Sequence, residues 1–76
     1  MKVIVKNNKT RMELLNIKAK YNYSSKEISI KTGIFYHKVL SLLNGKKIPT
    51  LQDLIKIGNA FNLKIDNILD YEIVEE

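Results

Sequence analysis

The chain has 76 residues, of which 45% are hydrophobic and 28% are charged, and its formal net charge is +5. This length and composition fit one small folded domain, spanning residues 1–76, and exclude a disordered tail or a chain of several domains. With no cysteine and one histidine, the chain cannot form disulfides and offers no Cys/His metal cluster, so we expect neither a metal nor a cofactor.

The first two predicted elements are a strand and a helix. Residues 2–6, KVIVK, are mostly β-branched and precede Asn7-Asn8, which predicts a strand. A helix is predicted from Thr10 to about Lys20, and Asn22 ends it. The apolar residues at helical spacing that we expect to face inward are Met12, Leu14, Leu15 and Ala19.

Two short helices around a glycine follow. Ser24 and Glu27 form an S-x-x-E capping box, which begins the second helix. Gly33 ends this helix because glycine adopts the left-handed backbone that other residues resist. The third helix is predicted over about 35–43, where Asn44-Gly45 stops it.

The C-terminal part predicts two more helices and a second strand. Pro49 cannot continue a helix, Thr50 caps the fourth helix, and Asp53 lies in its first turn. Gly58 is expected to let another helix come close. The residues predicted to face inward from the fourth helix are Leu51, Leu54, Ile55, Ile57 and Phe61, and a fifth, short helix contributes Ile65, Ile68 and Leu69.

Residues 71–75, YEIVE, have strand character like residues 2–6. The Lys-rich and Glu-rich segments can pair, either within one chain or across a dimer. The alternative is two frayed termini. We therefore predict an all-α domain of five helices over about 10–69, with terminal strands that can form a two-stranded β-ribbon.

Charge is distributed unevenly along the chain. Residues 1–50 carry eleven Lys and Arg against two acidic residues, whereas residues 51–76 carry two lysines against six acidic residues. A basic body fits a polyanionic partner, although a plain domain of high pI is the alternative. No membrane span or signal peptide is visible, so we expect a cytoplasmic protein with no membrane partner.

From about Leu14 to Leu69 the chain resembles the phage repressor and Cro-type (XRE-type, lambda repressor-like) helix-turn-helix family. The matching segments are SSKEISIKTGI, a V-x-x-L at Val39 and Leu42, and NGKKIPTLQDLIKIGNAFNLKIDNIL. The terminal strands look like those of small bacterial members that add a β-ribbon. The resemblance implies that the second helix crosses the DNA backbone and that the third enters the major groove, as a two-fold dimer on a palindrome.

The resemblance also implies a set of DNA-binding residues. Base edges or nearby phosphates would be contacted by Tyr36, His37, Lys38 and Ser41, and other phosphates by Ser24, Ser25, Asn44, Lys46 and Lys47. Helical spacing agrees, because Val39 and Leu42 point inward and leave the other side of the third helix for partners. The alternative for each residue is an ordinary surface or packing role.

Three residues depart from the family pattern. Phe35 occupies the usual Ser or Thr cap of the third helix. Leu43 stands where the family often has a glutamate paired with a first-helix arginine, at a position matched here by about Lys18. Leu40 is apolar where the family is polar. We expect Phe35, Leu40 and Leu43 to contact the ribbon or a second copy, ahead of thymine methyl groups.

The sequence therefore predicts a DNA-binding transcriptional regulator, most simply a repressor, that binds double-stranded DNA as a homodimer. A protein-interaction module on a degenerate helix-turn-helix, such as an antirepressor, antitoxin subunit or adaptor, is the alternative. An enzyme is not expected, because no nucleophile lies beside a base and no glycine-rich phosphate loop follows a strand. No small-molecule ligand is expected.

Overall fold

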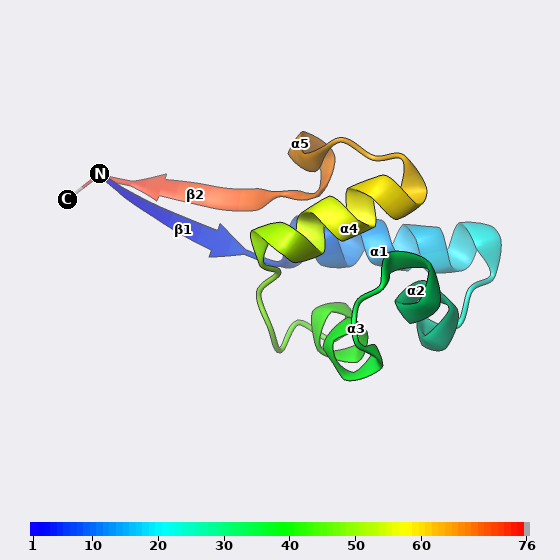
Figure 1. Ribbon diagram of the computed structural model, residues 1–76. Coiled ribbons are helices and arrows are strands. Elements are labelled where there is room, and N and C mark those ends of the chain that lie inside the picture. The colour runs from blue at the N-terminus through cyan, green and yellow to red at the C-terminus, as the bar shows by residue number, and fades with distance from the viewer. Residues whose placement is uncertain (76) are drawn as a thin grey trace.

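The protein folds into a helical body from which a β-ribbon extends (Figure 1). The computed structural model describes residues 1–75. Its elements are β1 (Lys2–Lys6), α1 (Asn8–Tyr21), α2 (Ser25–Thr32), α3 (Tyr36–Leu43), α4 (Leu51–Phe61), α5 (Ile65–Ile68) and β2 (Asp70–Val74). The predicted class, five helices with terminal strands, is confirmed.

The terminal ribbon, made of β1 and β2, is antiparallel and forms within one chain, which resolves the open choice in the sequence. Its register places Lys2 opposite Val74 and Lys6 opposite Asp70. Lys6 Nζ lies 2.6 Å from a Glu72 carboxylate oxygen, so the Lys-rich strand does pair with the acidic one. Figure 1 shows the ribbon leaving the body at the start of α1, with the start of β1 and the end of β2 at its tip.

The two faces of the terminal ribbon differ in chemistry. Directly opposed residues share a face, and the pairs Val3–Ile73 and Val5–Tyr71 alternate with pairs that contain Lys2, Glu72 and Lys6. One face is therefore apolar and the other is mostly charged. The apolar face is largely exposed to solvent.

Helix ends follow the residues that tolerate a left-handed backbone. Asn22 after α1, Gly33 after α2 and Gly45 after α3 have φ of 54°, 76° and 76°, as the sequence predicted. Asn62, which was not among the predicted helix stops, ends α4 in the same way, with φ 54°. Four local stops thus separate the helices.

The hydrophobic core lies where α1, α2, α3, α4 and α5 meet. Its buried members are Leu14, Ile28, Ile34, Val39, Leu42, Leu54, Ile57 and Ile68. Val39 and Leu42 are each only 1% exposed, so the predicted inward face of α3 is confirmed.

The predicted inward face of α1 is wrong in three of its four residues. Met12 is 58% exposed, and Leu15 and Ala19 are also exposed. The residues of α1 that are buried are Thr10, Leu14 and Ile17. An apolar pattern does not include Thr10, because threonine is polar. Thr10 can nevertheless be buried, because its hydroxyl donates to the Ile68 carbonyl at 2.6 Å.

The predicted face of α4 is displaced in the same manner. Leu51 is 66% exposed and Ile55 is also exposed, whereas Leu54 and Ile57 are buried as predicted. Asp53, which the sequence placed in the first turn of this helix, is also buried.

Gly58 of α4 allows a close approach, but the neighbour is not another helix. A Cβ at Gly58 would lie 2.7 Å from the Leu63 carbonyl oxygen, in the segment after α4. The Leu63 N–H in turn donates to the Gly58 carbonyl. The glycine therefore lets the chain turn back tightly over its own helix.

Candidate nucleic-acid interface

The α2–turn–α3 unit begins with a fixed helix start. The Ser24 hydroxyl accepts from the Glu27 N–H, and the Glu27 carboxylate accepts from the Ser24 N–H, both at 3.1 Å. This is the capping box that the sequence predicted. It defines where the first turn of α2 lies and therefore where its free N–H groups point.

Gly33 makes the turn between α2 and α3. Its N–H donates to the Ser29 carbonyl at 2.9 Å. Nothing lies within 4 Å of the place of a Cβ, so the positive φ, not crowding, favours glycine here. The next residue, Ile34, is buried and donates its N–H to the Thr32 hydroxyl. A buried anchor beside the turn holds α3 at a fixed angle to α2.

α3 presents two side chains to solvent at its first turn. Tyr36 and His37 are both exposed, and their rings meet edge to face with centroids 5.8 Å apart. Ser41 is half-buried, and its hydroxyl donates to the His37 carbonyl at 3.0 Å, so its one donor is used within the helix. Of the predicted base-reading residues, Tyr36 and His37 are the most available.

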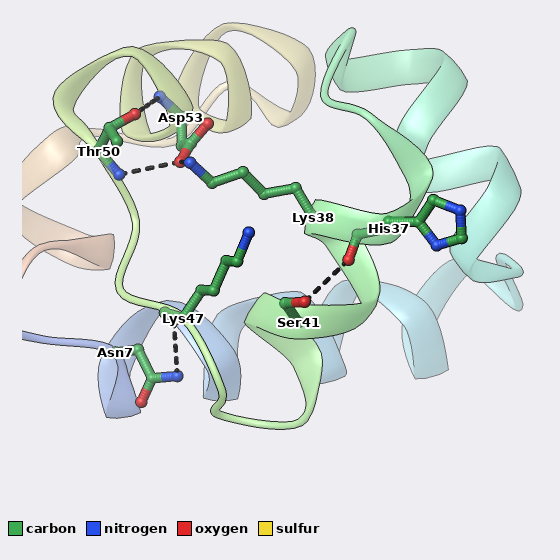
Figure 2. Close-up of polar contacts among 7 residues, drawn as sticks. All are labelled: Asn7, His37, Lys38, Ser41, Lys47, Thr50 and Asp53. Atoms are coloured by element: carbon green, nitrogen blue, oxygen red, sulfur yellow. Dashed lines mark hydrogen bonds and ion pairs between the residues drawn. The ribbon is translucent and has the colours of Figure 1, made fainter.

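Lys38 is turned toward the protein itself. Its Nζ lies 2.8 Å from an Asp53 carboxylate oxygen, and Figure 2 shows Lys38 pointing to the start of α4 while His37 points the other way. Asp53 also closes a capping box with Thr50, whose N–H donates to it at 2.9 Å. The ion pair therefore connects α3 with the start of α4.

Opposing effects set the pKa of the Asp53 carboxyl. Burial alone raises this pKa, but the hydrogen bonds from Lys38 and from Thr50 outweigh burial, so the pKa of Asp53 lies below its ordinary value. The carboxylate is thus held in its charged form, as an anchor for Lys38.

The segment after α3 carries three predicted phosphate-binding residues. Asn44, Lys46 and Lys47 are all exposed. Gly45 closes the helix with a Schellman turn, in which the Lys46 N–H donates to the Ser41 carbonyl at 2.9 Å. The Lys47 carbonyl accepts from Asn7 Nδ2 at 3.2 Å, as drawn in Figure 2, so the loop is tied to the start of α1.

Ser24 and Ser25 have side chains that are already engaged. The Ser24 hydroxyl caps α2, and the 8%-exposed Ser25 accepts from Lys18 Nζ at 3.2 Å. What this end of α2 can offer a phosphate is therefore its first backbone N–H groups, which a helix leaves without partners.

The three residues that differ from the family pattern lie in different environments. Leu43 is partly buried against the core, and Leu40 is half-buried, whereas Phe35 is 87% exposed. The terminal ribbon of the same chain therefore does not cover Phe35. As expected from the sequence, Phe35 makes no side-chain capping bond at the start of α3.

The contact between α1 and the end of α3 comes from a residue that the sequence analysis missed. Lys18 bonds to Ser25, while Arg11 Nε donates to the Leu43 carbonyl at 2.9 Å. A cation at a helix C-terminus is favourable because the last carbonyls lack partners. No local pattern marks this contact, since Arg11 and Leu43 are far apart in the chain.

Within residues 1–75, no three of His, Cys, Asp and Glu come together as metal ligands. None of the helices in that range is long and apolar enough to cross a membrane.

The arrangement is that of a helix-turn-helix fold, and comparison with known proteins agrees. The sequence profile of the Cro/C1-type HTH DNA-binding domain matches residues 13–73, from α1 into β2. The chain belongs to this family. Its class is thus a DNA-binding domain of transcriptional regulators, not an enzyme.

Individual relatives are archaeal. The chain is 29% and 27% identical to two uncharacterized HTH-type transcriptional regulators of Archaeoglobus fulgidus, over 82% of its own length and 87% and 89% of theirs. It is also 42% identical over 45 residues, or 59% of its length, to the replication factor C small subunit of Methanocaldococcus jannaschii, but spans 2% of that protein. No solved structure matches the chain significantly.

Proposed function

We propose that this protein is a sequence-specific DNA-binding repressor that binds a short palindromic operator as a homodimer. The observation that carries the proposal is the exposed first turn of α3, with Tyr36 and His37, on a rigid α2–α3 unit next to exposed Lys46 and Lys47. In this class the N-terminal part of the recognition helix, which is α3 here, contacts base edges. Such a regulator acts on the chromosome, in the cytoplasm.

The proposed roles follow the geometry. Tyr36 and His37 read base edges, since a phenol and an imidazole can both donate and accept hydrogen bonds. Ser41 lies on the same face, with its hydroxyl acceptor positions available. Lys38 is assigned mainly to positioning, because it neutralises Asp53 in the protein.

Phosphates are assigned to the two ends of the unit. The free N–H groups of the first turn of α2, which begins at Ser25 next to the Ser24 cap, face one phosphate, and the loop with Asn44, Lys46 and Lys47 faces another. Phosphate contacts fix the register of a protein on DNA but carry no sequence information.

We place the dimer contact on the apolar face of the terminal ribbon. A two-stranded ribbon is marginally stable alone in water, and here Val3, Tyr71 and Ile73 are exposed. If two copies paired edge to edge through β1, centred on Ile4, Lys2 of one copy would face Lys6 of the other. If they paired through β2, centred on Glu72, the two Glu72 carboxylates would face each other. Both arrangements place like charges together and are unfavourable. Stacking of the uncharged faces avoids these repulsions.

Selection of bound sequences from random oligonucleotides tests this function. We expect one enriched inverted repeat, with affinity that falls steeply as salt rises because phosphate contacts release counterions. Lys46→Ala should weaken binding to all sequences alike, whereas His37→Ala should relax preference at particular base pairs. Absence of any enriched sequence at every salt concentration would contradict the proposal.

A second candidate function, protein interaction through a degenerate helix-turn-helix, is favoured by one observation. Phe35 and Ile30 are largely exposed beside the turn. In that case a pull-down should return one stoichiometric protein partner, and Phe35→Ala should abolish its capture while DNA binding stays non-specific.

A further inference from the structure

Phe35 stands out among the exposed residues of the chain. At 87% exposure it exceeds every other large hydrophobic side chain in residues 1–75. It is the residue immediately before α3, with an extended backbone at φ −54° and ψ 139°. A ring in this position adds nothing to the core.

Phe35 also makes no side-chain capping hydrogen bond at the start of α3. The starts of α2 and α4 are each closed by a capping box from Ser24 and Thr50, whereas α3 begins without a side-chain acceptor. A residue that is exposed, apolar and non-capping violates two preferences at one place. Positions where local preferences are violated in this way are expected at functional sites.

The surroundings of Phe35 favour DNA over a protein as its partner. An open depression lined by Lys26, Ser29, Ile30 and Tyr36 lies across the α2–α3 turn. The ammonium and hydroxyl groups suit phosphates and base edges. A stable protein interface needs about 800 Å² on each partner with an apolar centre, whereas the exposed side chains of Phe35 and Ile30 lie beside Lys26 and polar groups.

The major groove offers one kind of apolar group to such a ring. Base edges there carry hydrogen-bond donors and acceptors, except for the 5-methyl group of thymine. We infer that Phe35 binds a thymine 5-methyl group, so that the operator requires thymine at a position next to the bases read by Tyr36 and His37. This inference rests on the proposed function and adds a readout by apolar contact to it.

Replacement of thymine by uracil removes the methyl group without changing base pairing, which isolates the proposed contact. On the selected operator, uracil in place of one thymine in a single half-site should weaken binding of the wild-type protein about fourfold, the factor for burying one methyl group. With Phe35→Ala, thymine and uracil operators should bind equally at that position. Leu51→Ala, which truncates an exposed residue of α4, is the matched control and should keep the fourfold ratio.

Each outcome has a distinct meaning. An enriched operator whose uracil versions bind the wild-type protein as well as thymine versions would overturn the methyl contact and leave the DNA-binding function in place. The methyl contact is also overturned if the Phe35→Ala variant still binds the thymine operator about fourfold more tightly than the uracil operator. Circular dichroism must show in that case that the variant is folded. If no operator is enriched, the proposed function itself fails.

Discussion

The starts of α3 and α4 meet the same physical need in opposite ways. Both helices leave N–H groups without partners. At α4, Thr50 and Asp53 cap these groups and Lys38 neutralises the buried carboxylate; at α3, Phe35 provides no cap and points its ring into solvent. The comparison indicates that α4 serves the stability of the frame, while the start of α3 is left free for a partner.

Asp53→Ala should produce the largest effect on this comparison. It removes the carboxylate that accepts from the Thr50 N–H in the capping box and leaves Lys38 without its partner, so we expect the free energy of unfolding to fall by about 2–3 kcal/mol. Glu27→Ala is the matched control, since Glu27 holds the same place in the other capping box but is exposed; its cost should stay near 0.5–1 kcal/mol. Urea unfolding of both variants measures the difference, and equal losses would contradict the role given to Asp53.

Lys38→Met should have the next largest effect. The methionine keeps most of the aliphatic stem but leaves the Asp53 carboxylate unpaired, which should cost about 1–2 kcal/mol, because the Lys38 side chain is partly exposed. The melting temperature should fall by several degrees for a chain of this size. Lys56→Met, on the exposed side of α4, should leave it unchanged.

These two predictions concern residues that sequence patterns identified only in part. Thr50 as a cap and Asp53 in the first turn of α4 were predicted, because capping is local. The ion pair between Asp53 and Lys38 was not predicted, because it joins two helices and because the sequence predicts that Lys38 contacts DNA. The same limit explains Thr10 and Arg11, whose partners Ile68 and Leu43 lie far along the chain.

The helix starts and stops were predictable for the same reason, since Ser24, Gly33 and Gly45 act through local backbone geometry. The isolation of Phe35 was not predictable. The sequence grouped it with Leu40 and Leu43 in one apolar patch, and only the fold reveals that these leucines are partly buried and that Ile34 takes the core position beside Phe35. The buried faces of α1 and α4 likewise include polar residues, Thr10 and Asp53, whose partners lie on other helices or strands of the fold and leave no local pattern.

Acid should weaken the start of α4 in a specific pH range. The pKa of Asp53 is lower in the folded protein than its ordinary value of 3.8, so its contribution is complete above that ordinary value. This stability is lost as pH falls from about 4 through the lower folded pKa. The melting temperature of the wild-type protein should therefore drop more than that of Asp53→Asn between pH 5 and pH 2. Parallel curves for the two proteins would exclude this role of the carboxylate.

Phe35→Ser should have the smallest effect on stability and the opposite sign. Serine supplies the missing acceptor at the start of α3, which should raise the free energy of unfolding by about 0.5–1 kcal/mol. Phe35→Ala, which also cannot cap, should stay within about 0.5 kcal/mol of the wild-type protein. A destabilised Phe35→Ser would mean that the ring supports the fold after all.

The central claim, that the protein binds DNA through α2, the start of α3 and the following loop, is tested most directly by backbone amide NMR shifts. The spectrum is recorded with and without the selected operator. We expect the largest shift changes at residues 24–26, 35–41 and 44–47, and small changes in α5 and at the tip of the terminal ribbon. Changes concentrated on the ribbon or on the outer side of α4, with residues 35–41 unaffected, would contradict it.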